Sequence, residues 1–373
     1  MTDRTRYTLL ALALLAIAGV IYYLEMQKPD SATANADIQT TNSSIIKDMT
    51  YPRAKEIVNP DGFINTESGT DGRGSPVKIA DYIGKKVILV DFLTYSCINC
   101  VRVQPYLNAW YEKYAEQGLQ IIGIHTPEFE FEKDYRNVSR AMEDMGVKYP
   151  VVLDNNYGTW RAYQNSYWPR KYLIDIDGYV VYDHIGEGGY DETEGMIQKL
   201  LNERASRLRE PHPIASGFFA PPEATGVSAG ISYTPETYFG AVRNARYLGN
   251  GNAGVVGTQT FVAPAREKFE THTTYLDGPW RIESEYAEGQ LGSKILLRFQ
   301  GKKVFVVAGS ARGAKLTVRV DGKLYTEADV QDGNLFVQDE RLYTIVELPE
   351  WGEHLLEIIV QEGNPQIFTF TFG

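Results

Sequence analysis

Short apolar runs alternate with amphipathic stretches over residues 56–209. Two of these runs, KVILVDFL at 86–93 and LQIIGIHT at 119–126, are continuous, which is typical of strands buried on both faces of a sheet. Between them, NCVRVQPYLNAWYEKYAEQ spaces its apolar side chains at helical intervals. Strands that alternate with helices predict an α/β domain over 56–209, with a mostly parallel sheet.

The remainder of this region continues the alternation. FEKDYRNVSRAMEDMG and YGTWRAYQ predict two helices, and RKYLIDIDGYVVYDH predicts two strands joined by a turn at Asp177 and Gly178. The closing stretch, DETEGMIQKLLNERASRLR, predicts a helix whose acidic residues come first and whose basic residues come last, the order that the helix dipole favours.

Helical spacing mostly disappears after a segment rich in proline and glycine, EPHPIASGFFAPPEATG. We interpret residues 210–233 as a linker. From Gly278 onward, short apolar runs such as KKVFVVAG and AKLTVRVDGKLYT are bounded by Gly, Asp and Pro. Such spacing predicts an all-β antiparallel sandwich, jelly-roll-like, over 234–373.

The amino-terminal region contains an uncharged run, Tyr7 to Leu24, that is long enough to cross a bilayer as a helix. Two arginines precede it, so we predict a transmembrane signal anchor over 1–29, with the other domains facing the periplasm or cell exterior. A cleaved signal peptide is the alternative, because ANA at 34–36 has the pattern of a cleavage site. The polar residues 30–55 predict a flexible tether.

The formal net charge of −11 argues against nucleic acid as a partner, because phosphate binding depends on clustered Lys and Arg. The five histidines show no metal-ligand spacing, and a zinc site needs about four ligands. We therefore predict no metal.

The chain has two cysteines, Cys97 and Cys100, both within FLTYSCINCVRVQP. A bond that closes so small a loop would add little stability, which argues against a structural disulfide. Cys97 follows a buried strand at the predicted start of a helix, where free amide N–H groups and the helix dipole favour a thiolate. Cys100 lies one turn later, where it can resolve a mixed disulfide. A C-x-x-C beside a βαβ pattern predicts a thioredoxin-like redox centre.

Residues 56–209 also resemble the thioredoxin superfamily. Asp91, six residues before Cys97, matches the buried acid of that family, which implies proton exchange with the resolving thiol; a surface carboxylate is the alternative. YWPRKYLIDIDG resembles the cis-proline segment, which implies that Pro169 is cis and that the backbone of Trp168 pairs with an extended substrate. No cofactor is implied beyond a redox-active disulfide between the cysteines.

A closer resemblance is to the periplasmic carboxy-terminal part of DipZ proteins, within the TlpA/ResA type of exported thioredoxins. It is carried by VDFLTYSCINCVRVQPYL, IGIHTPEFEFEKD and YPVVLDNNYGTW. Past the linker, GPWRIESEYAE and FTFTFG resemble the sandwich that follows in DipZ and is similar to a carbohydrate-binding module, so a carbohydrate is a candidate ligand there. Leu93 stands where these families usually have an aromatic residue. DipZ proteins carry a CcdA-like membrane domain in front, which implies a separate CcdA-like electron donor here.

These features predict a membrane-anchored, extracytoplasmic thiol-disulfide oxidoreductase that reduces protein disulfides. The neutral Ile98-Asn99 pair between the cysteines fits a reductant better than a strong oxidant. A thiol peroxidase on the same fold, using HTPEF, is one alternative. The other is a glycan- or protein-binding module with a redox regulatory domain.

Several further side chains are weaker candidates. Four glutamates, named below, could line the rim of the active site, although a run of charged residues is usually a solvated face. His125 ends a strand near the carboxyl edge of the sheet, where ligands gather, but a lone histidine is more often structural. The aromatic residues of the sandwich could form a sugar platform, although core packing is the commoner role. The residues in question are Glu128, Glu130, Glu132 and Glu187, and Trp280, Phe305 and Trp351.

Overall fold

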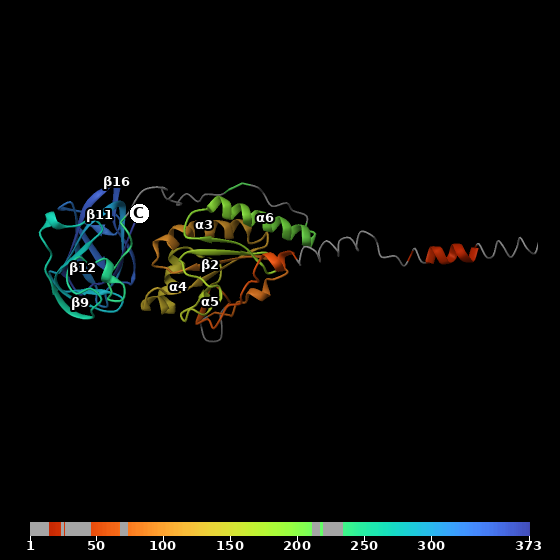
Figure 1. Ribbon diagram of the computed structural model, residues 1–373, viewed down its shortest axis with the longest axis horizontal. Helices are drawn as coiled ribbons and strands as arrows, with labels where there is room; N and C mark the ends of the chain where they lie inside the picture. The colour runs from red at the N-terminus through yellow and green to blue at the C-terminus, as the bar shows by residue number, and fades with distance from the viewer. Residues whose placement is uncertain (1–14, 24–25, 27–45, 68–73, 211–216, 219–233) are drawn as a thin grey trace, which may run out of the picture. The chain divides into compact units, whose positions relative to one another are not determined.

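The computed structural model describes residues 15–23, 26, 46–67, 74–210, 217–218 and 234–373. The chain divides into two units, Met1–Arg53 and Ala54–Gly373. Much of the expected anchor lies outside the described residues, as do its alternative cleavage site and most of the expected linker. Residues 15–23 are helical (Figure 1). Among the residues described, no helix combines the length and the apolar character that a membrane span requires.

Residues 54–210, which we call the α/β part, are built on a six-stranded sheet (Figure 1). Its strands lie in the order β1 (Gly62–Ile64), β4 (Val151–Leu153), β3 (Leu119–His125), β2 (Val87–Leu93), β5 (Arg170–Ile174) and β6 (Val180–Ile185). Only the β2–β3 and β3–β4 pairs are parallel. The prediction of a mostly parallel sheet is therefore wrong. The reason is local: β5 and β6 form a hairpin, and β1 enters antiparallel to β4.

Helices and apolar clusters cover both faces of this sheet. The helices are η1 (Ile79–Asp81), α3 (Ile98–Tyr114), η2 (Glu130–Lys133), α4 (Tyr135–Asp144), α5 (Gly158–Ala162) and α6 (Tyr190–Leu208). Along β2, Leu89 and Leu93 pack in the cluster shared with α3, α4 and α6, whereas Val90 and Phe92 pack in the opposite cluster. Strand side chains alternate between faces, so Asp91 lies on the face that α3 covers.

Residues 234–373, which we call the β part, form a large antiparallel sheet of eleven strands. The strands are β7 (Thr237–Tyr238), β8 (Gly257–Phe261), β9 (Thr274–Ile282), β10 (Ala287–Gly289), β11 (Lys294–Gly309), β12 (Ala314–Val320), β13 (Lys323–Leu324), β14 (Val330–Gln331), β15 (Asn334–Val337), β16 (Arg341–Glu362) and β17 (Gln366–Phe372), with η3 (Asn244–Arg246) and η4 (Arg266–Lys268) between them. The predicted antiparallel β architecture is confirmed, and hydrogen bonds join all these strands into one sheet. Trp280 and Phe305 are buried, whereas Trp351 is exposed.

Candidate active site

Cys97 lies where β2 leads into α3, at the N-cap of the helix. Its backbone is extended, its N–H donates to Thr94 O at 3.3 Å, and its carbonyl accepts from Val101 N at 3.0 Å. The residue is half-buried, and both cysteines are free thiols. The predicted helix start is therefore confirmed. An N-cap sulfur lies beside the unpaired amides of the first turn, where negative charge is stabilised.

Cys100 lies in the first turn of α3 and is buried, with 4% of its surface exposed. Burial raises the pKa of the Cys100 thiol well above its ordinary value, and the hydrogen bond to Cys97 acts in the same direction. The two sulfurs thus differ: the first can meet a substrate, whereas the second is held as a neutral thiol. To become a nucleophile, Cys100 needs a base inside the protein.

Asp91 supplies a candidate for that base. It is 2% exposed, on the face of β2 that α3 covers, and its Oδ1 has no hydrogen-bond partner in the described part of the chain. Burial raises the pKa of Asp91 to about 7, and Lys171 opposes that rise. Asp91 is thus a buried acid, as the resemblance implied, and not a surface carboxylate. A carboxylate that titrates near neutrality can both take and return a proton.

Lys171 is a residue that the sequence reasoning missed. It lies on β5 directly opposite Asp91 in the antiparallel ladder, is fully buried, and donates from Nζ to Gly186 O at 3.1 Å. Burial lowers the pKa of the Lys171 amine, and Asp91, Cys100 and Glu187 oppose that effect. The signal in the sequence was a lysine at an inward-alternating position of RKYLI.

The Trp168–Pro169 peptide bond is cis, as the resemblance implied. The Trp168 indole donates from Nε1 to Thr126 O at 3.1 Å, and its ring lies 4.4 Å from that of Trp160. Trp168 and Cys97 pack against the same apolar cluster. Within the ranges that the structure describes, the backbone N–H and C=O of Trp168 have no hydrogen-bond partner, so they remain free to pair with another chain.

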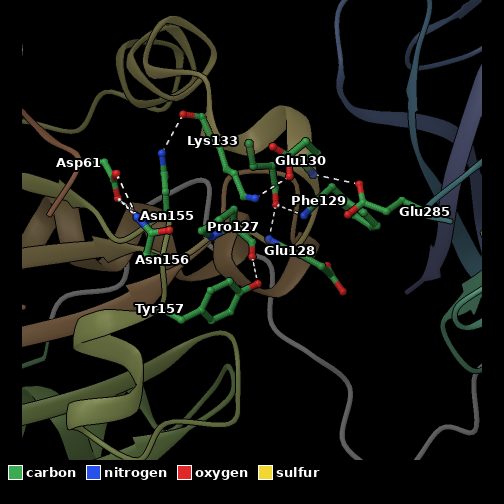
Figure 2. Close-up of polar contacts among 11 residues, drawn as sticks. Asp61, Pro127, Glu128, Phe129, Glu130, Lys133, Asn155, Asn156, Tyr157 and Glu285 are labelled. Carbon is green, nitrogen blue, oxygen red and sulfur yellow. Dashed lines mark hydrogen bonds and ion pairs between the residues drawn. The ribbon is translucent and has the colours of Figure 1, made fainter. Parts of the chain in front are cut away.

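The four candidate carboxylates separate into different roles. Glu132 is fully buried beside Ser96, and Glu187 is half-buried and pairs with Arg102 at 3.3 Å. Glu130 is 74% exposed and pairs with Lys133 (Figure 2). Glu128 accepts from Arg243 at 2.6 Å and from Tyr238 at 3.0 Å, and so contacts the β part.

His125 ends β3 and is fully buried. Its Nε2 accepts from Tyr95 N at 3.3 Å, and the two rings stack with centroids 5.7 Å apart. Burial lowers the pKa of His125 to about 3, so the ring is neutral at physiological pH. The structural reading of this histidine is the one that its contacts support. No group of three or more His, Cys, Asp or Glu side chains in the described ranges is arranged to hold a metal ion.

Two family models match the chain: Redoxin over residues 48–200, and the thioredoxin-like C-terminal domain over 234–373. Protein DipZ of Mycobacterium tuberculosis is 33% identical over 342 residues, which cover 91% of this chain and 45% of DipZ. Thiol-disulfide oxidoreductase ResA of Bacillus cereus is 34% identical over 131 residues, which cover 35% of this chain and 72% of ResA. The chain belongs to the thioredoxin-like thiol-disulfide oxidoreductases.

This oxidoreductase spans less than half the length of the DipZ proteins that it matches, since they are covered to 45%. Among solved structures, a thiol-disulfide isomerase from Corynebacterium glutamicum is similar at a TM-score of 0.34 and 17% identity, over 41% of this chain and 97% of that one. The matches to relatives confirm the resemblance to DipZ over 91% of the chain and the resemblance to ResA over 131 residues.

Proposed function

We propose that this protein is a membrane-anchored, extracytoplasmic reductase of protein disulfides whose reacting centre is the Cys97–Cys100 pair. The observation that carries the proposal is the difference between the two sulfurs. Cys97 is half-buried at the N-cap of α3, while Cys100 is buried one turn inside, with its pKa raised. This arrangement suits attack by one thiol and resolution by the other.

The reaction begins when the Cys97 thiolate attacks one sulfur of the substrate disulfide. A mixed disulfide forms, and the other substrate sulfur leaves as a thiolate that takes a proton from water. Asp91 then accepts the proton of Cys100, and the Cys100 thiolate attacks the Cys97 sulfur. The second substrate sulfur leaves as a thiolate that takes a proton from water, and Asp91 releases its proton to the solvent. Two electrons have then passed to the substrate, and the enzyme is left with a Cys97–Cys100 disulfide.

Lys171 supports the proton-transfer step. As the residue facing Asp91 in a dry environment, it stabilises the ionised carboxylate, so that more of it is deprotonated near neutral pH. Without this amine, the pKa of Asp91 would rise further, and a smaller fraction of the carboxylate would be ionised and able to accept the Cys100 proton at neutral pH. Lys171 is therefore a positioning residue that acts through Asp91.

Substrate docking is assigned to Trp168 and Pro169. The free backbone N–H and C=O of Trp168 can pair with an extended substrate strand, and the indole is fixed by Thr126 and Trp160. The Trp168–Pro169 segment is therefore suited to a substrate chain that is extended and carries a disulfide.

The setting of the enzyme is also part of the proposal. Residues 1–29 form the anchor, 30–55 the tether, 56–209 the thioredoxin-like domain, 210–233 the linker and 234–373 the sandwich. The two family models and the two separate sheets support the division between a thioredoxin-like domain and a second, β domain. A CcdA-like membrane protein would return electrons to the Cys97–Cys100 disulfide. A carbohydrate ligand for 234–373 is supported by the DipZ resemblance alone, since two of the three candidate aromatics are buried.

The experiment that tests the function is a trapping assay with Cys100→Ser in the full-length chain, carried out with a disulfide-bonded model protein such as insulin. We expect a mixed disulfide between Cys97 and the substrate that a reductant cleaves. We expect no mixed disulfide with Cys97→Ser. A folded Cys100→Ser variant that captures no substrate would contradict the proposal. Rapid, Cys97-dependent consumption of peroxide by the wild-type protein would favour the peroxidase instead.

A further inference from the structure

The loop that presents Cys97 is fastened by a buried carboxylate, that of Glu132 in η2. Glu132 Oε1 accepts from the Ser96 hydroxyl at 2.6 Å and from Ser96 N at 3.3 Å. Its Oε2 accepts from Phe129 N at 2.9 Å and from Glu128 N at 2.5 Å, in the Pro127–Glu130 loop shown in Figure 2. One side chain thus joins the residue before Cys97 to a loop more than thirty positions later.

Glu132 is fully buried, yet no ion pair joins it to a cation in the described ranges. A buried carboxylate without a counter-ion is costly, and hydrogen bonds offset that cost only in part. Three of its four donors are backbone amides, which cannot accept a proton in return, so the surroundings match the ionised form. Burial raises the pKa of Glu132, and the Ser96 hydrogen bond opposes that rise.

The carboxylate is hydrogen-bonded to the residue that precedes the reacting cysteine. Because it accepts from the amide of Ser96, standard chain dimensions keep it within about 11 Å of Cys97 Sγ. The other titratable groups that face Glu132 are Glu128, Tyr95 and Tyr157. None of these is a cation. Arg243, whose guanidinium lies over the Phe129 ring, pairs with the Glu128 carboxylate at 2.6 Å and not with Glu132. The residues between the cysteines, Ile98 and Asn99, carry no charge either.

We propose that Glu132 is a positioning residue that makes the cysteine pair more reducing. It fixes the Ser96–Cys97 segment at the helix start, and its negative charge opposes the gain of a second negative charge on Cys97. A dithiol whose thiolate is less stabilised gives up its electrons more readily. This inference rests on the proposed reductase function and specifies what sets the direction of electron transfer.

The test compares Glu132→Gln with two matched controls in the full-length protein. Glu130→Gln removes a neighbouring carboxylate that is exposed. Glu194→Gln removes a buried carboxylate that accepts from Tyr114, at the far end of α3. The seventeen residues of that helix place it about 25 Å away. For each variant, the rate of Cys97 alkylation is measured against pH, and the Cys97–Cys100 midpoint potential is measured against glutathione.

We expect Glu132→Gln to move the alkylation profile about one pH unit toward lower pH. The midpoint potential should become less reducing. Glu130→Gln and Glu194→Gln should leave both quantities at their wild-type values, even though Glu194→Gln lowers the melting temperature. A Glu132→Gln variant that melts earlier but keeps the wild-type profile and potential would show a purely structural role and overturn the proposal.

A second measurement needs no substitution at Glu132, in case that variant does not fold. Linkage requires that if the ionisation of Glu132 shifts the Cys97–Cys100 midpoint potential, then the redox state of the cysteines shifts the pKa of Glu132 by the same free energy. In wild-type protein with carbon-13-labelled glutamate, the Glu132 carboxyl signal should titrate at different pH values in the dithiol and disulfide forms. Identical titrations would refute the proposal. Failure of Cys100→Ser trapping alongside a shifted profile would instead reject only the protein-disulfide substrate.

Discussion

Asp91 and Lys171 face each other across the antiparallel ladder between β2 and β5, and both side chains are buried beneath α3. The sequence motif identified Asp91, but no motif identified the lysine that faces it. Their pairing makes the proton chemistry of Cys100 a property of two strands that are eighty residues apart in the sequence. This relationship leads to the first two predictions.

Lys171→Met should slow the resolving step at neutral pH. Lys171 holds the pKa of Asp91 down to about 7, so its removal raises that pKa further and leaves less of the ionised base at pH 7. The rate of insulin reduction should fall several-fold at pH 7 and recover as the pH rises toward 9. Lys171→Arg, which keeps a cation, is the control. A Lys171→Met profile that superimposes on the wild-type one would reject this role.

Asp91→Asn should change how stability depends on pH. The folded-state pKa of Asp91 is raised from 3.8 to about 7, so this group favours the folded state most at low pH. That contribution is lost as the pH rises through about 7. Relative to the wild type, Asp91→Asn should therefore gain stability between pH 4 and pH 8, by up to about 4 kcal/mol. Urea unfolding at the two pH values measures this, and an unchanged difference would contradict it.

His125→Gln should protect the protein against mild acid. Burial depresses the folded-state pKa of His125 from 6.5 to about 3, so its contribution to stability is present above pH 6.5 and is lost as the pH falls. Between pH 6.5 and pH 5 the wild type should lose about 2 kcal/mol more than His125→Gln. The glutamine carbonyl can still accept from Tyr95 N. Denaturant unfolding at the two pH values measures the loss of stability. Equal losses in the two proteins would show that His125 does not titrate in this way.

Trp168→Ala should weaken the binding of protein substrates more than the chemistry. It removes the ring that packs on Trp160 and the hydrogen bond to Thr126 O that hold the docking segment. We expect KM for insulin to rise about three- to tenfold, with the rate of alkylation of Cys97 unchanged. Reduction of a small aromatic disulfide serves as the control, because it needs no extended docking strand. A parallel loss in both assays would indicate a general defect.

Sequence alone was sufficient for those parts of the site that depend on short spacings. Cys97, Cys100 and Asp91 lie within ten positions, so one strand and one helix start fix their arrangement. The position of Lys171 opposite Asp91 depends on the register of β2 and β5, and the contact of Glu132 with Ser96 depends on a loop that folds back. Such contacts join distant positions, and no local pattern reports them.

In the β part, the sequence predicted breaks at two glycines where the structure has continuous strands. The apolar runs SKILLRFQG and RLYTIVELPEWG end at Gly301 and Gly352, yet β11 and β16 run through both positions. The two glycines face each other in the ladder, next to a shift in register. Because the irregularities coincide, the pairing resumes beyond them. A break in the apolar pattern can therefore mark a bulge as well as a strand end.

The unequal exposure of the two sulfurs also bears on damage by oxidants. A small oxidant would meet Cys97 first and convert it to a sulfenic acid, the one oxidised state of a single cysteine sulfur that a nearby thiol can reverse. Cys100, sheltered one turn below, can condense with it and expel water to give the disulfide. The fold thus converts oxidation of Cys97 into a Cys97–Cys100 disulfide, which two electrons reduce back to the dithiol.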